Sequence, residues 1–358
     1  MSGPVAVGVA LVLAAAAALV PGRVARADAP VLQPKPRGMT VSCFRWGPGE
    51  WDGPQMPATV DRLASLGVNW IAIHPYASVA DDGGLRRTGF PASAVTVPTR
   101  LARERGMQMF VKPHLGYWRS RFTWRGEIGW DDAATEQRFL DAYRAWILEQ
   151  AELAEAAGAA CFAVGTELRK LVHHEAWWRE TIRQVRERFS GPLTYAANFD
   201  EYTLVPFWDA LDLIGVQWYF PLIETPDPEA HRPERPPTDA ELHRGWTRNL
   251  ATLRAFAEAQ GRPVLLTEFG HSATPLAAAA PWLTGESGPD PAAALALKTR
   301  LMRIGLDRLA GVEGEPWFAG VFLWKWFPSP DDIAGEFVLQ YPAMEQVLRA
   351  RWGGAAAD

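Results

Sequence analysis

The sequence predicts a single-domain (β/α)8 barrel, also called a TIM barrel, and two patterns carry this prediction. Short apolar runs of strand length alternate with helical segments along the 358 residues, as expected for parallel strands covered by helices. Connections from a helix to the next strand take one to three residues, whereas three strand-to-helix connections are long: 115–130, 221–237 and 271–289. In a (β/α)8 barrel these loops all lie at the C-terminal ends of the strands, where the functional site forms.

The expected strands are, in chain order, 38–44, 69–74, 107–114, 159–168, 192–198, 213–220, 263–270 and 318–327. Glycine commonly ends a helix, and a glycine stands at five helix-to-strand junctions, Gly67, Gly106, Gly158, Gly191 and Gly261. The first helix is expected at 57–66. The longest is expected at 131–157, with Asp131 or Asp132 as its N-cap and apolar residues at helical spacing.

The first 27 residues are predicted to be a signal peptide, and the catalytic domain to span 28–358. The apolar run 5–20 is shorter than the roughly 20 residues that cross a bilayer. The tripeptide at 25–27, Ala-Arg-Ala, fits a cleavage site, so we expect a secreted protein. Because Lys and Arg are absent before the apolar run, an uncleaved membrane anchor is the alternative.

Charge and residue spacing exclude several classes of function. The net charge is −5, and it becomes −7 when Arg23 and Arg26 leave with the signal peptide, so nucleic acid and anionic membranes are poor partners. No metal-ligand motif occurs, the pair His173-His174 is expected at the surface, and we expect neither metal nor cofactor. Cys43 and Cys161 lie on non-neighbouring strands and are expected to be buried thiols rather than a disulfide.

Two carboxylates stand out because each closes an apolar strand with the sequence Thr-Glu. They are Glu167, near the end of the fourth expected strand, and Glu268, near the end of the seventh. Strict alternation would place Glu167 on one face with Cys161, Ala163 and Gly165, and Glu268 with Val264 and Leu266. If those faces point into the barrel, the pair can hydrolyse a glycosidic bond, which needs two carboxylates. The alternative is that each Glu only pairs with a cation such as Arg169 or Lys170.

Other residues at the same rim are candidates for binding sugar, which stacks on flat aromatic side chains. The chain has 17 tryptophans, many of which a core and its loops would use. The predicted substrate-binding residues are Trp46, His114, Asn198, Trp218, Tyr219 and Trp324. Packing is the alternative for the aromatic residues, and a turn-forming role is the alternative for Asn198.

Five motifs occur in an order that resembles glycoside hydrolase family 113. They are KPH at 112–114, WRGEIGW at 124–130, VGTEL at 164–168, GVQWYFP at 215–221 and LLTEFG at 265–270, and the likeness runs from about Arg37 to Arg349. The resemblance implies a retaining, endo-acting β-1,4-mannanase in which Glu167 matches the acid/base and Glu268 the nucleophile. It also implies that Tyr219 hydrogen-bonds the nucleophile and that Trp324 lies beneath the reacting sugar. Thr166 stands where the wider clan has Asn.

The substrate is therefore expected to be a polysaccharide or oligosaccharide, cleaved by a monomer. Another β-linked polymer, chitosan or a glucan, is the main alternative, because loop shape sets the choice of sugar. A non-catalytic sugar-binding barrel is a weaker alternative, since it would lose a catalytic carboxylate and both are present here. The sequence does not distinguish endo from exo action.

Overall fold

Eight parallel strands close into a barrel in the computed structural model, which describes residues 32–43, 50–87, 90–225, 235–285, 288–328 and 337–353. Around the barrel the strands follow the order β1-β2-β5-β7-β8-β9-β10-β11, with β11 pairing back to β1. Their bounds are Arg37–Val41 (β1), Trp70–Ile73 (β2), Gln108–Val111 (β5), Cys161–Thr166 (β7), Leu193–Ala197 (β8), Ile214–Trp218 (β9), Val264–Phe269 (β10) and Phe318–Trp326 (β11). The predicted (β/α)8 barrel is confirmed.

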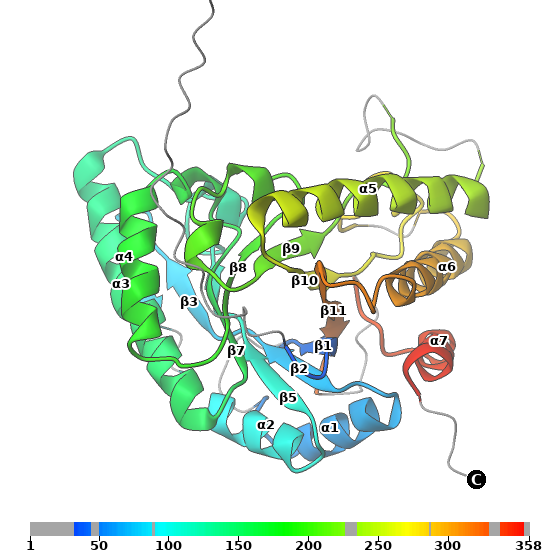
Figure 1. Cartoon of the computed structure of the whole chain (residues 1–358), viewed down its shortest axis with the longest axis horizontal. Helices are drawn as coiled ribbons and strands as arrows, with labels where there is room; N and C mark the ends of the chain where they lie inside the picture. Colours follow the sequence, from blue (N-terminus) through cyan, green and yellow to red (C-terminus); the bar gives the residue numbers. More distant parts are fainter. Residues whose placement is uncertain are drawn as a thin grey trace, which may run out of the picture.

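Helices surround the barrel on all sides (Figure 1). Their bounds are Met56–Ser65 (α1), Ser93–Arg103 (α2), Ala133–Ala157 (α3), Glu175–Arg186 (α4), Asp239–Gln260 (α5), Pro291–Ala310 (α6) and Pro342–Trp352 (α7). Between β8 and β9 two 3₁₀ turns, Tyr202–Leu204 (η3) and Trp208–Ala210 (η4), stand in place of an α-helix. Each of the other seven barrel strands is followed by an α-helix before the next barrel strand or the end of the described chain.

The helix ends follow the residues that the sequence offers. Asp132 caps α3 by accepting a hydrogen bond from the Thr135 amide at 2.8 Å, and Gly158 ends the helix in the left-handed conformation with φ 74°. Gly67, Gly106 and Gly261 also have positive φ. Gly191 is not among the glycines with positive φ, so it does not adopt the left-handed conformation at its junction.

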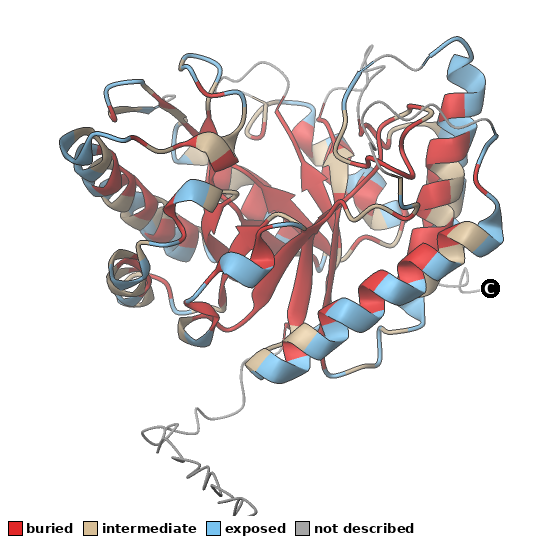
Figure 2. Cartoon of the chain, turned by 90° about the horizontal axis from the view of Figure 1, so that it is seen from above, coloured by how far each residue is buried: buried red, intermediate tan, exposed pale blue. Residues whose placement is uncertain are grey.

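Two apolar layers form the core. A smaller cluster fills the barrel interior, with Trp70, Ala72, Phe110, Cys161, Ala163, Leu213, Leu265 and Phe322 among its members. A larger cluster lies between the strands and the helices. Figure 2 shows the barrel strands mostly buried, whereas the helices alternate buried and exposed faces. Cys43 and Cys161 are both buried and are not joined in a disulfide, as predicted.

A small second sheet, which the sequence analysis did not predict, covers part of the barrel's C-terminal end. It consists of Tyr76–Val79 (β3), Leu85–Arg87 (β4) and His114–Gly116 (β6), in the order β4-β3-β6. β3 follows β2 and β6 follows β5 after short breaks, so the sheet extends two barrel strands beyond the rim. This extension holds His114 in a strand, with Tyr76 as its register partner.

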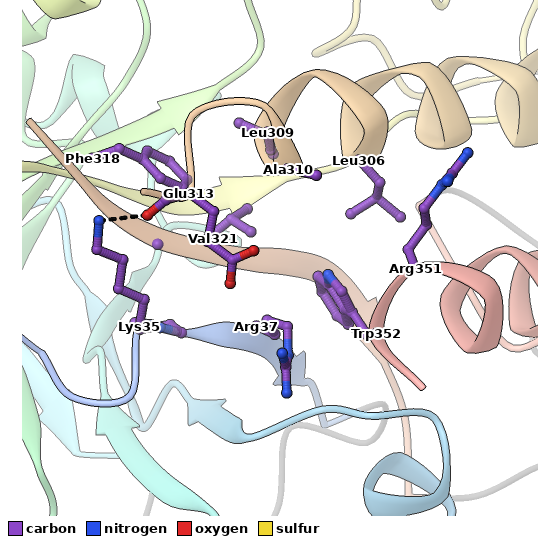
Figure 3. A pocket seen from close by; sticks show the side chains of 12 residues that line it. Lys35, Arg37, Leu306, Leu309, Ala310, Glu313, Phe318, Val321, Arg351 and Trp352 are labelled. Carbon is purple, nitrogen blue, oxygen red and sulfur yellow. Dashed lines mark hydrogen bonds between the residues drawn. The ribbon is translucent and has the colours of Figure 1, made fainter. Parts of the chain in front are cut away.

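The opposite end of the barrel is where the strands begin, near Arg37 and Phe318. A cavity of about 40 Å³ lies there between β1, β11 and the ends of α6 and α7 (Figure 3). The Lys35 ammonium donates to the backbone oxygens of Glu313 at 2.6 Å and Glu315 at 2.8 Å beside it. Since a water needs about 10–15 Å³ of such volume, this cavity has room for a few waters but not for a sugar.

The predicted signal peptide, residues 1–27, lies outside the described residues. So does Trp46, one of the predicted substrate-binding residues. Among the helices that the structure describes, none is both long enough and apolar enough to span a bilayer.

Candidate active site

Glu268 faces the interior because β10 is irregular at this point. Leu265 belongs to the barrel-interior cluster and Leu266 to the outer cluster, so strict alternation would turn Glu268 outward. Instead the pairing register with β9 shifts between Leu266 and Glu268, which re-aims the side chain into the barrel. The prediction that Val264, Leu266 and Glu268 share one face is therefore wrong, although the carboxylate reaches the expected rim.

The orientation of the Glu167 side chain also depends on a local irregularity of the backbone, just past the end of β7. Ala163 points into the barrel, but a Cβ on Gly165 would lie 2.8 Å from Trp178 and 2.9 Å from Tyr195 in the outer layer. The predicted shared face of Ala163, Gly165 and Glu167 is thus wrong. Glu167 has φ 56°, a left-handed conformation that costs a non-glycine residue energy and is common at functional sites.

Hydrogen bonds on both sides hold this left-handed turn. The Glu167 amide donates to the Ala196 oxygen at 3.0 Å, and the Leu168 amide donates to the Tyr195 hydroxyl at 2.7 Å. Tyr195 in turn donates to the buried Glu201 carboxyl at 2.5 Å. Burial raises the pKa of Glu201 to about 8. The backbone strain at Glu167 is therefore supported by a chain of buried polar groups.

Three side chains surround the Glu268 carboxylate, which is almost fully buried. The Lys112 ammonium, just past β5, forms an ion pair with Oε1. The Tyr219 hydroxyl, just past β9, donates to Oε2 at 2.6 Å, and His114 Nε2 lies 3.9 Å from Oε1. Burial lowers the pKa of Lys112, and the negative charge of Glu268 opposes this shift. Both oxygens of the Glu268 carboxylate thus accept from a hydrogen-bond donor, Oε1 from Lys112 and Oε2 from Tyr219.

Among the described residues, Arg125 is the cationic partner of the Glu167 carboxylate and forms an ion pair with Oε2. The same guanidinium donates to the Leu115 oxygen at 3.0 Å and lies 3.2 Å from His114 Nδ1. Burial raises the pKa of the Glu167 carboxyl, and the charge of Arg125 opposes this shift. His114 therefore contacts both halves of the site, and the two carboxylates meet at one end of the barrel.

Arg125 is the site residue that the sequence analysis missed. It lies in the 3₁₀ turn Arg125–Glu127 (η1), inside the quoted WRGEIGW motif, so the motif itself was the available signal. Neither of the cations proposed as ordinary partners is the one found: Arg169 pairs with Asp200 instead.

Comparison with known proteins identifies the family. The profile of Glycoside Hydrolase Family 113 matches residues 42–333, most of the chain. The chain belongs to glycoside hydrolase family 113. The resemblance stated from the motifs is confirmed, and the chain is a glycoside hydrolase. A comparison with curated proteins finds no significant match.

Solved structures of family 113 share the fold. One described as a GH113 β-1,4-mannanase is 19% identical, with a TM-score of 0.73 over 90% of this chain and 99% of that one. The GH113 β-mannanase from Alicyclobacillus acidocaldarius, solved in complex with ManMIm, is 27% identical, with a TM-score of 0.72 over 88% and 96%. A family 5 mannosidase from Rhizomucor miehei is more distant, at 10% identity and a TM-score of 0.63 over 88% and 92%.

A stack of rings forms one wall of this family 113 site. His74 stacks on His114 with ring centroids 4.8 Å apart, and His114 stacks on Trp324 at 5.8 Å. The Lys112 ammonium lies 5.1 Å from the centroid of the Trp324 ring. Burial, followed by the positive charges of Lys112 and Arg125, lowers the pKa of both histidines well below the ordinary value, so both are neutral imidazoles. Trp324 is partly exposed and borders the site, as a sugar platform requires.

The remaining predicted binding residues have separate outcomes. Trp218 is buried and stacks on Trp246 of α5 with centroids 4.2 Å apart, so its prediction as a substrate contact is wrong. The Asn198 side chain accepts a hydrogen bond from the Phe199 amide at 3.0 Å, which is the turn-forming role considered for it. A substrate contact by Asn198 stays a prediction, as does one by Trp46, which lies outside the described residues.

Proposed function

We propose that this glycoside hydrolase cleaves β-1,4-linked mannan or mannooligosaccharides with retention of configuration, by double displacement. The observation that carries the proposal is the unequal pairing of the two carboxylates. Glu268 has two donors that favour its ionised form, as a nucleophile requires, whereas burial raises the pKa of Glu167 so that it can hold a proton.

In the first step the Glu268 carboxylate attacks the anomeric carbon, and the glycosidic bond breaks. Glu167 gives its proton to the departing sugar oxygen, and the result is a glycosyl ester on Glu268. Glu167 is then an anion, and the Arg125 guanidinium forms an ion pair with it. In the second step Glu167 takes a proton from water, the water oxygen attacks the anomeric carbon, and Glu268 leaves as a carboxylate.

Mannan is the proposed substrate because the similar family 113 structures are described as β-mannanases. The wall of Trp324, His114 and His74 offers one flat face for a sugar ring and neutral imidazoles beside it. Neutral imidazoles can hydrogen-bond sugar hydroxyls without competing for Glu268 as cations would.

The test is purified protein on a panel of mannan, glucomannan, chitosan and cellulose oligomers, with products separated by length and proton NMR of the first product formed. We expect cleavage of the mannose-containing oligomers, internal products, and an initial β anomer. Faster cleavage of chitosan or cellulose oligomers would contradict the substrate. An initial α anomer would contradict the retaining mechanism.

We also propose that the protein is exported after removal of residues 1–27 and acts as a monomer. The supporting feature is the short apolar run followed by Ala-Arg-Ala. N-terminal sequencing of protein from culture medium should begin at Asp28, and light scattering should give the mass of one chain. Full-length chain recovered only from membranes would indicate an anchor instead.

A further inference from the structure

Three potential metal ligands gather beside the catalytic rim, outside the site described above. They are Glu136 in the first turn of α3 and the adjacent pair His173 and His174 immediately before α4. One ligand atom from each lies within 4.8 Å of the others. His174 Nε2 is 2.8 Å from Glu136 Oε1, and the two imidazole rings lie 4.0 Å apart between centroids.

We propose that Glu136, His173 and His174 bind one divalent transition-metal ion, with Zn²⁺ the best fit. Two imidazoles and one carboxylate form a ligand set that zinc uses, and water completes a tetrahedron. Ligand atoms in a tetrahedron around zinc, each about 2.0–2.1 Å from the ion, lie roughly 3.3 Å from one another. The three ligand atoms here lie within 4.8 Å of one another, so binding would draw the wider pairs together and part the 2.8 Å pair of His174 and Glu136 slightly. Calcium and magnesium are disfavoured, since they prefer oxygen ligands.

The surroundings suit an ion that enters from solvent. His173 is exposed and borders a surface hollow also lined by His174, Glu175 and Trp177. The Trp130 amide donates to Glu136 Oε2 at 3.2 Å, which leaves Oε1 directed at the imidazole. Outer hydrogen bonds of this kind orient metal ligands. Arg179, the cation that also borders the hollow, is paired with Glu175 and Asp209.

Binding requires a change at His174. In the metal-free protein its Nε2 and Glu136 Oε1 share one proton in a hydrogen bond. To ligate through Nε2, His174 must carry its proton on Nδ1 or release one to solvent.

The position of the cluster gives the ion a structural role. α3 and α4 lie side by side (Figure 1), and each follows a loop that contributes to catalysis. The loop before α3 carries Arg125, and the loop before α4 begins at Glu167. A bound ion would join the two loops and restrict the Arg125–Glu167 pair. This consequence for catalysis rests on the proposed function, whereas metal binding does not.

The test is a titration of chelator-treated, full-length protein with ZnCl₂. Calorimetry measures the binding, and the midpoint temperature of thermal unfolding is measured with and without zinc. We expect one zinc per chain and a midpoint that rises with zinc. In His173→Ala, His174→Ala and Glu136→Gln the affinity should fall at least about 10-fold, as second-shell losses alone cost that much. His243→Ala on α5 is the matched control, and it should bind zinc as the unchanged protein does. Co²⁺ in place of zinc should give the strong visible absorption of a tetrahedral site.

Absence of saturable zinc binding would overturn the proposal, and so would equal affinity in the three variants and the control. Folding is checked separately, by circular dichroism of each variant in chelator. If His174→Ala is too unstable to study, the exposed His173→Ala decides alone. A protein that binds no zinc but still hydrolyses mannan would leave the proposed function standing, so the two failures are distinguishable.

Discussion

The two carboxylates proposed to be catalytic differ in where their partners come from. Glu268 is held by Lys112 and Tyr219, which directly follow barrel strands β5 and β9. Glu167 is held by Arg125, which belongs to a 3₁₀ turn in a long loop, and its own backbone is left-handed. One carboxylate is thus held by residues at the ends of barrel strands, whereas the other is held by a residue of a long loop.

This difference matches the chemistry expected of each group. A nucleophile attacks from one fixed position, so rigid partners help it. An acid/base changes its charge twice in each turnover, so a partner that stabilises only its anion must not hold it permanently. Because the histidines are neutral, the ion pairs of the two carboxylates are those of Glu268 with Lys112 and of Glu167 with Arg125. When Glu167 is protonated, the positive charge of Arg125 loses its anionic partner.

The largest effects should come from removing the carboxylates themselves. Glu268→Ala should lower the rate on both a mannan oligomer and an aryl β-mannoside, by a factor on the order of 10⁴ or more, because no covalent intermediate forms. Glu167→Ala should lose about 10²- to 10⁴-fold on the oligomer and far less on the aryl mannoside, whose phenolate leaves without a proton. Glu187→Ala, at a surface ion pair, is the control, and steady-state kinetics measure all three. Near-normal rates in both catalytic variants would place the site elsewhere.

Removing the rigid cation should have the next largest effect. Lys112→Met leaves Glu268 buried without its ion-pair partner, and breaking a buried pair costs about 3–5 kcal/mol. We expect kcat/KM to fall by roughly 10²- to 10³-fold. Thermal melting, measured in parallel, separates loss of fold from loss of rate. An unchanged kcat/KM in a folded variant would show that Lys112 does not hold the nucleophile.

Tyr219→Phe should have a smaller effect, because it removes one hydrogen bond and keeps the ring. A hydrogen bond to a charged group contributes about 1.5–3 kcal/mol, so kcat/KM should fall roughly 10- to 100-fold. Trp218→Phe is the comparison on the opposite face of the same strand. It should lower the melting temperature and leave the kinetic constants of the folded enzyme unchanged.

Arg125→Gln should change the pH profile more than the rate at the optimum, where we expect a loss of about 10-fold. Arg125 opposes the upward shift in the pKa of Glu167, so its removal raises that pKa. Because Glu167 must be protonated in the first step, the alkaline limb of kcat/KM should move to higher pH. Arg121→Gln, in the same loop but bonded to the Gly129 oxygen, is the control. A limb that stays in place would show that the pair does not control protonation.

The fold could be predicted from the sequence, because apolar runs and the glycine after each of several helices are local signals. The two Thr-Glu strand ends also located the rim. The orientation of these residues could not be predicted, since a register shift in β10 and a left-handed turn after β7 both break the two-residue alternation. Alternation could have excluded Trp218: it neighbours Tyr219, so only one of the two can face the site.

Arg125 shows the other limit of sequence reasoning. It is 42 residues from Glu167 along the chain, and its contact depends on how a long loop folds back over the rim. The small sheet of β3, β4 and β6, which helps to shape that region, has strands of only three or four residues. Such short segments carry no clear periodicity.

The assignment of roles to Glu167 and Glu268 is tested most directly by azide rescue of the two Ala variants on an aryl β-mannoside. In Glu167→Ala azide can attack the glycosyl-enzyme, so the account predicts a β-mannosyl azide. In Glu268→Ala azide can only attack the substrate itself, so any product should be the α anomer. NMR of the isolated azides gives the configuration. An α-azide from Glu167→Ala together with a β-azide from Glu268→Ala would reverse the roles and contradict the account.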